Sequence, residues 1–395
     1  MSQTILVTGG AGYIGGFTVR QLLDEGYKVV VIDSLENGHR EAIDTRAVLE
    51  VINIADSSGV SKVFQQYKPV AVIDFAAYLA VGESMEDPLR YMKNNVENFI
   101  GLLDVMVKHG CKYVIKSSTA STYGDPLHES DFPLREDYQA TFKPEKSALL
   151  PGKWDGKDVS GERFFEKIID YYRELVIDRE ELALTDEEIT KLRIPASVYG
   201  LTKLLDEILM KKYDNLYGVK SVALRYFNVC GAGENGEIGE DKPKPTTLMT
   251  LCFWNILGRT AELSVFGDDY PTEDGTCIRD YIHPLDLATG HIAALRYLTQ
   301  NNASNVFNLG NGKGYSVFDV IREAESASGK KVNYKVVSRR SGDPAVSYCD
   351  PSRAGTVLGW KASHDLSNMA KTAWDWHSKH PEGYAAGPNP AVASA

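Results

Sequence analysis

The first fifteen residues constrain the fold of this chain more strongly than any other stretch. Residues 5–7 are an apolar run that indicates a buried strand, and a glycine-rich turn follows directly. After the turn, apolar residues recur at helical spacing from Tyr13 to Glu25. A strand, a glycine turn and a helix in this order bring backbone N–H groups and a helix N-terminus against a pyrophosphate. The stretch therefore predicts a phosphate-binding turn at the start of an α/β fold.

The spacing of the glycines and a later carboxylate make this prediction more specific. Gly10, Gly12 and Gly15 fit G-x-G-x-x-G, and the last two fit the wider G-x-x-G-x-x-G together with Gly9. A second predicted strand ends in Asp33, about 20 residues further on, where a carboxylate binds the adenosine ribose hydroxyls. No arginine directly follows Asp33, so a 2′-phosphate would be repelled. The pattern predicts a dinucleotide site that favours NAD over NADP.

Composition and charge are those of an ordinary globular protein. Hydrophobic residues make up 43% of the chain and charged residues 25%, and the formal net charge is −11. The acidic balance argues against a nucleic-acid partner or an anionic membrane surface, although a few local arginines can hold a phosphorylated substrate. We expect no signal peptide, because the N-terminus runs directly into the first strand, and no apolar run approaches a membrane span.

Five cysteines are scattered along the chain without C-x-x-C spacing. An odd number of separated cysteines indicates reduced thiols, most of them in the core, and no metal site. Together with the composition, this predicts a cytoplasmic enzyme.

Strands and helices alternate well beyond the first unit. Apolar strands separated by helices are typical of parallel sheets, so we predict an α/β fold with a doubly wound parallel sheet of the Rossmann type. The candidate strands are 47–52, 70–73, 112–116 and 221–228, and the candidate helices begin near Asp56, at Pro88 (ending near His109) and at Val198 (ending at Tyr217).

The alternation suggests a division of the chain. We expect a dinucleotide-binding domain at 1–230, a smaller mixed lobe that closes over a ligand at 231–384, and a disordered tail at 385–395. Residues 144–193 interrupt the first domain with a turn-rich part followed by a charged, helix-prone part. A helical insertion packed on the surface is the expected structure, and a substrate lid or partner-docking element is the alternative that the sequence leaves open.

Tyr199 and Lys203 are four residues apart on the predicted helix 198–217, so they share one face. A free tyrosine has a pKa of about 10 and is a poor base at neutral pH. A nearby ammonium, together with a positive nicotinamide ring, would favour the phenolate and lower that pKa. Such pairs also occur on ordinary surfaces. Behind a dinucleotide turn, and with a hydroxyl-rich strand end at 117–119, the pair indicates a proton-transfer site.

Several longer motifs extend this pattern over nearly the whole chain, except the insertion and the tail. They are 8–15 (TGGAGYIG), 80–84 (AVGES), 94–96 (NNV), 121–124 (STYG), 224–228 (LRYFN), 239–241 (GED), 266–276 (FGDDYPTEDGT), 279–283 (RDYIH) and 339–343 (RRSGD). With them the chain resembles the extended short-chain dehydrogenase/reductase family and, within it, the UDP-glucose 4-epimerases. The lobe at 231–384 is then expected to be the UDP-sugar-binding domain.

The resemblance implies a reversible epimerisation at C4 of UDP-glucose and UDP-galactose. Tyr199 would take the proton of the sugar 4-hydroxyl while NAD accepts the hydride from C4. The 4-keto sugar would then turn over in the pocket and take the hydride back on its other face. Thr119, where such epimerases usually carry a serine, would hydrogen-bond the same oxygen, and Lys203 would also hold the nicotinamide ribose.

The resemblance also implies two sets of binding residues. For NAD they are Gly9, Gly12, Tyr13, Ile14, Gly15, Asp33, Asn37, Asn53, Ile54, Phe75, Ala76, Asn94, Ser117, Tyr199, Lys203 and Tyr226. For the UDP-sugar they are Thr119, Tyr199, Asn228, Thr247, Leu248, Phe266, Arg279, Tyr281, Arg340, Asp343 and Ser347. Arginines suit the second set because a guanidinium fork pairs with phosphate.

Some positions depart from the family pattern. Leu79 replaces a lysine near the cofactor, Asn53 an aspartate near the adenine, and Thr246-Thr247 a pair of asparagines near the UDP. Ser347 stands where a bulky tyrosine restricts such enzymes to plain hexoses, so we expect N-acetylated UDP-hexoses to be substrates as well. A register shift of one residue would place Tyr348 at that position instead.

Two alternatives remain. A nucleotide-sugar 4,6-dehydratase or decarboxylase on the same fold needs an acid/base carboxylate just after the strand-end threonine, where this chain has Ala120 and Ser121. A non-catalytic NAD-sensing protein typically loses the tyrosine or the lysine, and this chain keeps both. Related epimerases are dimers that pair the helices corresponding to 88–109 and 198–217, so a homodimer is expected.

Overall fold

Seven parallel strands form the central sheet of the structure. The structure is a computed structural model that describes residues 2–124, 132–136, 195, 197–340 and 343–384. Every neighbouring pair is parallel, which confirms the predicted sheet. The strands lie in the order β10 (Asn305–Leu309), β6 (Lys220–Tyr226), β5 (Tyr113–Thr119), β4 (Ala71–Asp74), β1 (Thr4–Thr8), β2 (Lys28–Asp33) and β3 (Val48–Val51).

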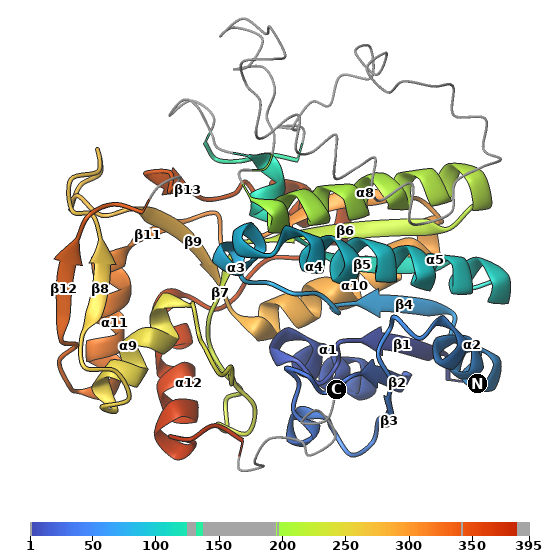
Figure 1. The fold of residues 1–395 in the computed structure, drawn as a ribbon, viewed down its shortest axis with the longest axis horizontal. Coiled ribbons are helices and arrows are strands. Elements are labelled where there is room, and N and C mark those ends of the chain that lie inside the picture. Colours follow the sequence, from blue (N-terminus) through green and yellow to red (C-terminus); the bar gives the residue numbers. More distant parts are fainter. Residues whose placement is uncertain (1, 125–131, 137–194, 196, 341–342, 385–395) are drawn as a thin grey trace, which may run out of the picture.

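The order of the strands reverses between β1 and β4. From β1 the chain builds outward through β2 to β3, and from β4 it builds in the opposite direction through β5 and β6 (Figure 1). In open parallel sheets, ligands bind beyond the carboxyl ends of the strands at such a switch point. The residues that follow β1, β4 and β5 are therefore placed at one candidate site.

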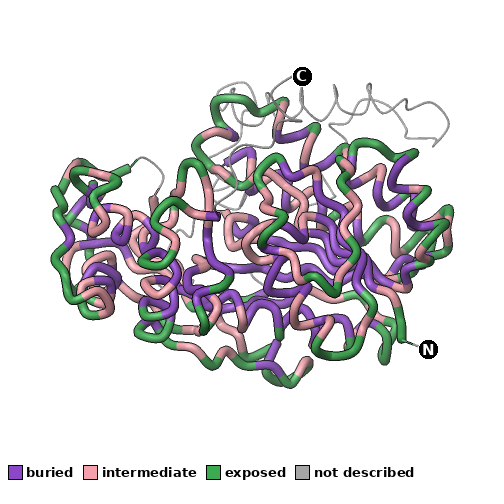
Figure 2. The backbone as a smooth tube through the Cα atoms, turned by 90° about the horizontal axis from the view of Figure 1, so that it is seen from below, coloured by how far each residue is buried: buried purple, intermediate pink, exposed green. Residues whose placement is uncertain are grey.

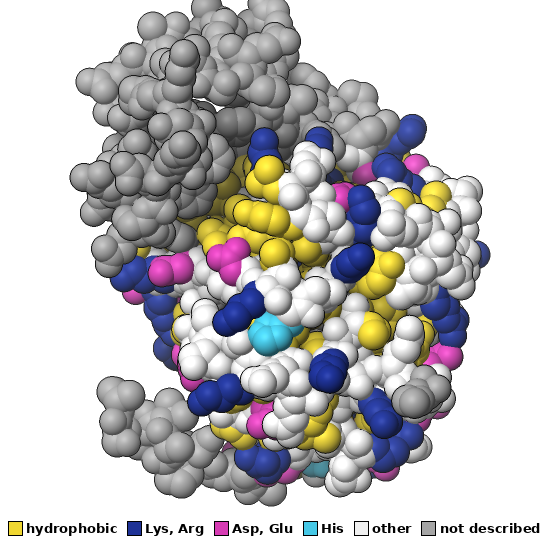
Figure 3. All heavy atoms as spheres, turned by 90° about the vertical axis from the view of Figure 1, so that its right-hand side faces the viewer, with side chains coloured by type: hydrophobic (Ala, Val, Ile, Leu, Met, Phe, Trp, Pro, Cys, Tyr) yellow, Lys and Arg dark blue, Asp and Glu magenta, His cyan; other side chains and the backbone are white. Residues whose placement is uncertain are grey.

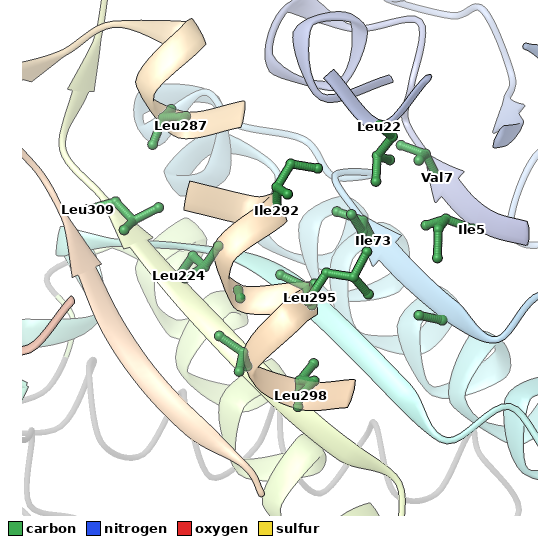
Figure 4. Close-up of a cluster of buried hydrophobic side chains, with 14 of the residues drawn as sticks. Ile5, Val7, Leu22, Ile73, Leu224, Leu287, Ile292, Leu295, Leu298 and Leu309 are labelled. Carbon is green, nitrogen blue, oxygen red and sulfur yellow. The ribbon is translucent and has the colours of Figure 1, made fainter. Parts of the chain in front are cut away.

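Helices cover both faces of this sheet, because successive residues of a strand point to opposite sides. Ile5 and Val7 pack in the cluster under α1 (Tyr13–Asp24) and α10 (Pro284–Asn301), which Figure 4 shows. Leu6 packs on the other face, under α2 (Ser57–Tyr67), α5 (Asn98–His109) and α8 (Val198–Tyr217). The buried strands form the middle of the larger part of the molecule in Figure 2.

The expected helix from Pro88 to His109 is helical throughout, but it is not a single regular α-helix. It comprises α4 (Pro88–Tyr91), a π-helical segment η2 (Met92–Glu97) and α5, and it follows the short α3 (Val81–Glu86). Asp87 caps α4 by accepting a hydrogen bond from the Arg90 N–H at 3.1 Å. A π-segment inside a helix often marks a functional region, and η2 carries the predicted cofactor residue Asn94.

A smaller part lies beside the sheet and has its own core (Figure 1). β9 (Ile278–Ile282) is its central strand and pairs with β7 (Asn228–Val229), β11 (Gly314–Ser316) and β13 (Val346–Ser347). β8 (Leu263–Phe266) pairs with β12 (Tyr334–Val337). The remaining elements are α9 (Leu248–Ile256), α11 (Val317–Ser328), α12 (Leu366–Lys379), the 3₁₀ turns η1 (Arg40–Ala42) and η3 (Ala120–Tyr123) and the π-turn η6 (Ala354–Leu358).

The sheet does not end at the expected domain division. β10 supplies its edge strand and α10 covers one face, so residues beyond 230 return to the dinucleotide-binding part. Only the second half of β10 is buried, and this weak apolar pattern gave no strand signal in the sequence. The expected insertion at 144–193 and tail at 385–395 lie outside the described residues. None of the helices within the described residues is long and apolar enough to cross a membrane.

We predict that Phe307→Ala in β10 lowers the free energy of unfolding by about 3–5 kcal/mol, because it removes a fully buried ring from the main core. Urea unfolding followed by circular dichroism measures this change. The control Val357→Ala alters a side chain that is 44% exposed and should change stability by less than about 0.5 kcal/mol. A negligible effect of Phe307→Ala would mean that β10 is not part of the cooperative sheet.

Candidate active site

The turn after β1 brings three backbone segments into close contact. A Cβ atom on Gly15 would lie 2.3 Å from the Gly9 carbonyl oxygen, and one on Gly9 would lie 2.8 Å from the Ala76 nitrogen. Gly9 also has a φ of +67°, which favours glycine. Gly12 is the N-cap of α1, and no side chain caps that helix. The first turn of α1 therefore presents backbone N–H groups in a narrow cradle, which fits a pyrophosphate.

Asp33, at the end of β2, is held against this turn. Its two carboxylate oxygens accept hydrogen bonds from the N–H groups of Ala11 at 2.9 Å and Leu35 at 2.8 Å. Burial raises the pKa of Asp33, and the two backbone hydrogen bonds and His39 oppose that rise. The carboxylate is thus fixed beside the cradle, where it suits an adenosine ribose. The glycines and Asp33 together fit a bound dinucleotide.

Four other residues predicted to bind NAD lie in two places. Phe75 and Tyr226 lie at strand ends and share His291: the Phe75 and His291 ring centroids are 4.7 Å apart, and the Tyr226 hydroxyl is 2.6 Å from His291 Nε2. Asn37 and Asn53 are exposed near the ends of β2 and β3, and Asn53 Oδ1 accepts a hydrogen bond from the Ala55 N–H at 2.9 Å. The predicted assignments of both groups to NAD stay predictions.

Three further predicted cofactor residues have defined surroundings. Ile54 is buried in the core that covers one face of the sheet. Asn94 is half-buried and donates a hydrogen bond to Asn95 Oδ1 at 3.0 Å. Tyr13 begins α1, and its hydroxyl donates to the Gly231 carbonyl oxygen at 2.5 Å. Tyr13 thus links the cofactor turn to the chain that leads into the smaller lobe.

The predicted catalytic residues come from β5 and α8. Ser197 caps α8 by accepting a hydrogen bond from the Gly200 N–H at 3.1 Å, so the first turns of the helix carry Tyr199 and Lys203. Lys203 is buried, and its Nζ donates to the Ser117 carbonyl oxygen at 2.9 Å and to Ser117 Oγ at 3.2 Å. Thr119, at the end of β5, interacts with the Tyr199 phenol. The structure therefore brings these residues together.

The electrostatics of the Tyr199–Lys203 pair differ from the simple expectation that Lys203 lowers the pKa of Tyr199. Withdrawal from water raises the pKa of Tyr199 to about 12, while the Thr119 hydroxyl and the Lys116 charge lower it and Asp206 raises it. Burial and the Lys116 charge together lower the pKa of Lys203 to about 7, although the nearby carboxylates oppose this shift. A lysine that loses its proton near neutral pH is a weak source of positive charge. The protein groups alone therefore favour the neutral phenol.

Sequence reasoning missed a buried ion-pair cluster behind this pair. Lys116 Nζ lies 2.5 Å from Asp74 Oδ2 and 3.3 Å from Asp206 Oδ2, and all three side chains are almost fully buried. Beside it, Arg225 pairs with Glu207 at 2.6 Å, and Ser118 Oγ donates to Glu207 at 2.6 Å. A lysine in the apolar strand 112–116 was the available signal, because a buried lysine needs a partner.

Apart from Thr119 and Tyr199, the residues predicted to hold the UDP-sugar lie in the smaller lobe or on β7 beside it. Arg279 donates from Nη1 to the Pro344 carbonyl oxygen at 2.8 Å, and its Nη2 lies 3.5 Å from Asp343 Oδ1. The Arg340 guanidinium lies 4.1 Å from the centre of the Phe266 ring. β9 and β13 place Ser347 directly beside Arg279. The structure thus brings Arg279, Asp343 and Ser347 together.

Other predicted substrate residues are partly occupied by contacts within the protein. Asn228 donates from its side-chain amide to the Asp280 carbonyl oxygen at 3.0 Å, and Tyr281 is buried in the small core. Thr247 is the N-cap residue before Leu248, and its hydroxyl donates to the buried carboxylate of Glu240. Burial raises the pKa of Glu240, but Lys242 and the hydroxyls of Thr247 and Thr250 outweigh this effect and lower that pKa.

Of the departures from the family pattern, Leu79 is 48% exposed and Thr246 is also exposed. Tyr348, the alternative to Ser347, stacks on Phe132 with ring centroids 5.9 Å apart. This contact holds Tyr348 against the segment 132–136, and neighbouring residues of a strand point to opposite sides. The geometry therefore favours Ser347 as the residue beside Arg279.

Comparison with known proteins agrees with this geometry. The NAD dependent epimerase/dehydratase family matches residues 5–146, and the GDP-mannose 4,6 dehydratase family matches residues 180–373. The UDP-glucose 4-epimerase of Lacticaseibacillus casei is 38% identical over 383 residues, which cover 97% of this chain and 99% of that protein.

Solved structures give the same result. The UDP-glucose-4-epimerase of Stenotrophomonas maltophila, with bound NAD and formylated UDP-arabinopyranose, is 33% identical with a TM-score of 0.79, covering 96% of this chain and 99% of that one. The UDP-Glc/GlcNAc 4-epimerase of Campylobacter jejuni is 32% identical with a TM-score of 0.71, covering 96% and 100%. The predicted resemblance is confirmed, and the chain belongs to the UDP-glucose 4-epimerase family.

Proposed function

We propose that the chain catalyses the NAD-dependent, reversible epimerisation of UDP-hexoses at C4. The convergence of Tyr199, Lys203 and Thr119 beyond the end of β5, beside a dinucleotide cradle, is the observation that carries the proposal. When bound, NAD accepts a hydride from C4 of the sugar and later returns it. The full-length similarity to UDP-glucose 4-epimerases supports the same reaction.

The chain's own residues would move the proton and hold the sugar. The Tyr199 phenolate takes the proton of the 4-hydroxyl, and the Thr119 hydroxyl hydrogen-bonds the same oxygen. A threonine can do this in place of a serine, although its methyl group restricts the rotamer. Lys203, which donates hydrogen bonds to Ser117, would hold the nicotinamide ribose. A positive charge on the bound nicotinamide would oppose the rise in the Tyr199 pKa that burial causes.

The smaller lobe would hold the UDP while the 4-keto sugar turns over. Arg279 and Arg340 supply guanidinium groups that suit a diphosphate: Arg279 lies on β9, and the Arg340 guanidinium lies over the Phe266 ring of β8. Arg279 is already oriented by the Pro344 carbonyl and Asp343. Anchoring through the nucleotide leaves the sugar ring free to rotate, which the return of the hydride to the opposite face requires.

The two alternative functions have less support. The match of residues 180–373 to a 4,6-dehydratase family agrees with a nucleotide-sugar lobe. Elimination, however, needs a carboxylate after Thr119, and η3 places Ala120 and Ser121 there. A non-catalytic NAD-sensing protein would not need the buried contact between Lys203 and Ser117, which positions Lys203 beside Tyr199.

We further infer that the substrate range includes N-acetylated UDP-hexoses. Ser347 is a small side chain beside Arg279, so it leaves room for a bulky substituent at C2 of the sugar. A related protein named as a UDP-Glc/GlcNAc 4-epimerase has the same fold.

A homodimer in the cytoplasm is the proposed state of the protein. Leu89, Ile208, Leu216 and Tyr217 are exposed apolar residues on α4 and α8. Figure 3 looks onto the right-hand side of Figure 1, where α5 and α8 end, and shows hydrophobic side chains gathered there. Such a patch fits an interface. The cysteines Cys111, Cys230, Cys252, Cys277 and Cys349 are free and buried, which agrees with a reducing compartment.

Tyr199→Phe should reduce the conversion of UDP-galactose to UDP-glucose by about 10²–10⁴-fold, because it removes the proton acceptor. The purified protein is assayed by chromatography of the nucleotide sugars, and retained NAD is measured after denaturation. NAD content should be unchanged, and the exposed control Tyr217→Phe should keep full turnover. Undiminished turnover in Tyr199→Phe would refute the base assignment, and net build-up of reduced cofactor or a dehydrated product would refute epimerisation.

Ser347→Tyr should abolish conversion of UDP-N-acetylgalactosamine while leaving UDP-galactose conversion within about threefold, because a large ring excludes only the bulkier C2 substituent. Both substrates are assayed on the same preparations. The neighbouring variant Tyr348→Phe, which keeps the ring on Phe132, should convert both substrates. Equal activity of Ser347→Tyr on both substrates would contradict the role of this residue.

Ile208→Glu should convert the homodimer to a monomer, because burying an unpaired carboxylate in an apolar interface is strongly unfavourable. Light scattering coupled to gel filtration measures the molar mass. Val357→Glu, at another exposed apolar position, should remain dimeric. The interface proposal fails if Ile208→Glu is still a dimer, and a monomeric wild-type protein would exclude the homodimer.

A further inference from the structure

The side chain of Lys116 is a buried cation that no role described so far requires. It lies in β5, directly before Ser117, and its side chain is fully buried. Asp74 is 2.5 Å and Asp206 3.3 Å from its ammonium, and the Phe99 ring centre is 4.2 Å away. An ion pair in such a place contributes little net stability compared with apolar packing. Its presence therefore calls for an explanation beyond stability.

The cluster touches the catalytic pair from two sides. On β5, the residue after Lys116 is Ser117, which accepts both hydrogen bonds of the Lys203 ammonium. On α8, Asp206 follows Lys203 by three residues, so the two side chains lie on the same side of the helix. Lys116 and Asp206 both act electrostatically on Tyr199 as well as on Lys203.

The two carboxylates of the cluster are not equivalent. Asp74 accepts hydrogen bonds from the Thr8 hydroxyl and from the Ala76 N–H, in addition to its ion pair with Lys116. Among the described residues, the Lys116 ammonium, 3.3 Å from Oδ2, is the one ion-pair partner of the Asp206 carboxylate, and neither of its buried oxygens accepts a hydrogen bond of good geometry. A buried carboxylate without hydrogen bonds is unfavourable. Asp74 thus anchors the lysine structurally, whereas Asp206 is held in place mainly by charge.

We propose that Lys116 and Asp206 are positioning residues that set the proton affinity of the Tyr199–Lys203 pair from behind, Lys116 by a fixed positive charge and Asp206 by an opposing negative one. The proposal rests on the proposed epimerase function. It assigns no contact with the substrate to either residue.

The groups that face the catalytic pair determine the expected signs. Tyr199 is faced by Thr119 and Lys116 from β5, by the Tyr226 phenol from β6 and by Asp206 from its own helix. Lys203 is faced by Lys116, Asp74, Asp206 and Glu207. Glu207 is already paired with Arg225. The positive charge of Lys116 lowers the pKa of both Tyr199 and Lys203, and the negative charge of Asp206 raises both.

The test is the pH profile of kcat in two single variants and their combination. Activity rises with pH as Tyr199 loses its proton, so Lys116→Met should move the acidic limb to higher pH and Asp206→Asn to lower pH, each by about one pH unit. The double variant Lys116→Met/Asp206→Asn should lie between the two, near the wild type. The exposed control Lys62→Met should not shift the profile.

Opposite shifts distinguish an electrostatic role from a structural one, because loss of packing alone lowers activity without moving the limb in a charge-dependent direction. Lys116 changes the pKa of Tyr199 and of Lys203 more strongly than Asp206 does. The shift of the acidic limb expected for Lys116→Met therefore keeps its direction even if Asp206 takes up a proton in that variant. If Lys116→Met does not fold, the pH profile of Asp206→Asn alone tests the proposal. In that variant Lys116 keeps its ion pair with Asp74, so its charge stays paired in the core.

A second readout does not depend on turnover. In protein carrying isotope-labelled lysine and its retained NAD, NMR should show Lys203, assigned with Lys203→Met, titrating at higher pH in Lys116→Met and at lower pH in Asp206→Asn than in the wild type. Unshifted titration of Lys203 and an unshifted kcat profile in Asp206→Asn would overturn the proposal. If the wild type itself does not epimerise UDP-galactose, the proposed function fails instead, and the NMR titration still tests the electrostatic coupling.

Discussion

The close approach of β1, its glycine turn and α1 is the contact on which the rest of the structure depends. A Cβ atom on Gly15 would lie 2.3 Å from the Gly9 oxygen, so a larger residue there would force the helix away from the strand. With glycine, α1 begins directly over the end of β1, and the backbone of Ala76 after β4 touches the same turn. Ligands of open parallel sheets bind where the strand order reverses, which in this sheet is between β1 and β4. The close approach at the glycine turn leaves this position open for a ligand.

This binding position is completed by residues that are far away in the chain. Tyr13 reaches the carbonyl of Gly231, and His291 on α10 contacts both Phe75 and Tyr226. Burial lowers the pKa of His291 to about 4, so the ring stays neutral and can accept a hydrogen bond from Tyr226 at Nε2 while Nδ1 faces the Leu287 carbonyl oxygen. The Tyr13 contact ties the cofactor turn to the chain that leads into the smaller lobe, and the His291 contacts tie α10 to the ends of β4 and β6.

The charges behind the site modify what the catalytic residues can do. A tyrosine and a lysine one helical turn apart predict a proton-transfer pair, but burial pushes the pKa of Tyr199 upward and that of Lys203 downward. Lys116, Asp74 and Asp206 lie on three different elements and meet only because β4, β5 and α8 pack together. Their effect on the pair could not be inferred from spacing along the chain.

The sequence by itself determined the parallel sheet, the glycine turn with Asp33, and the placement of Tyr199 and Lys203 on one helix face, because each depends on local periodicity or short spacing. It did not reveal that β10 and α10 return to the sheet, since β10 is a half-buried edge strand with a weak apolar pattern. Only the tertiary structure decided that Ser347 lies beside Arg279 and that Lys116 is paired behind the site. Strand pairing and burial bring those residues together, and neither is encoded in local spacing.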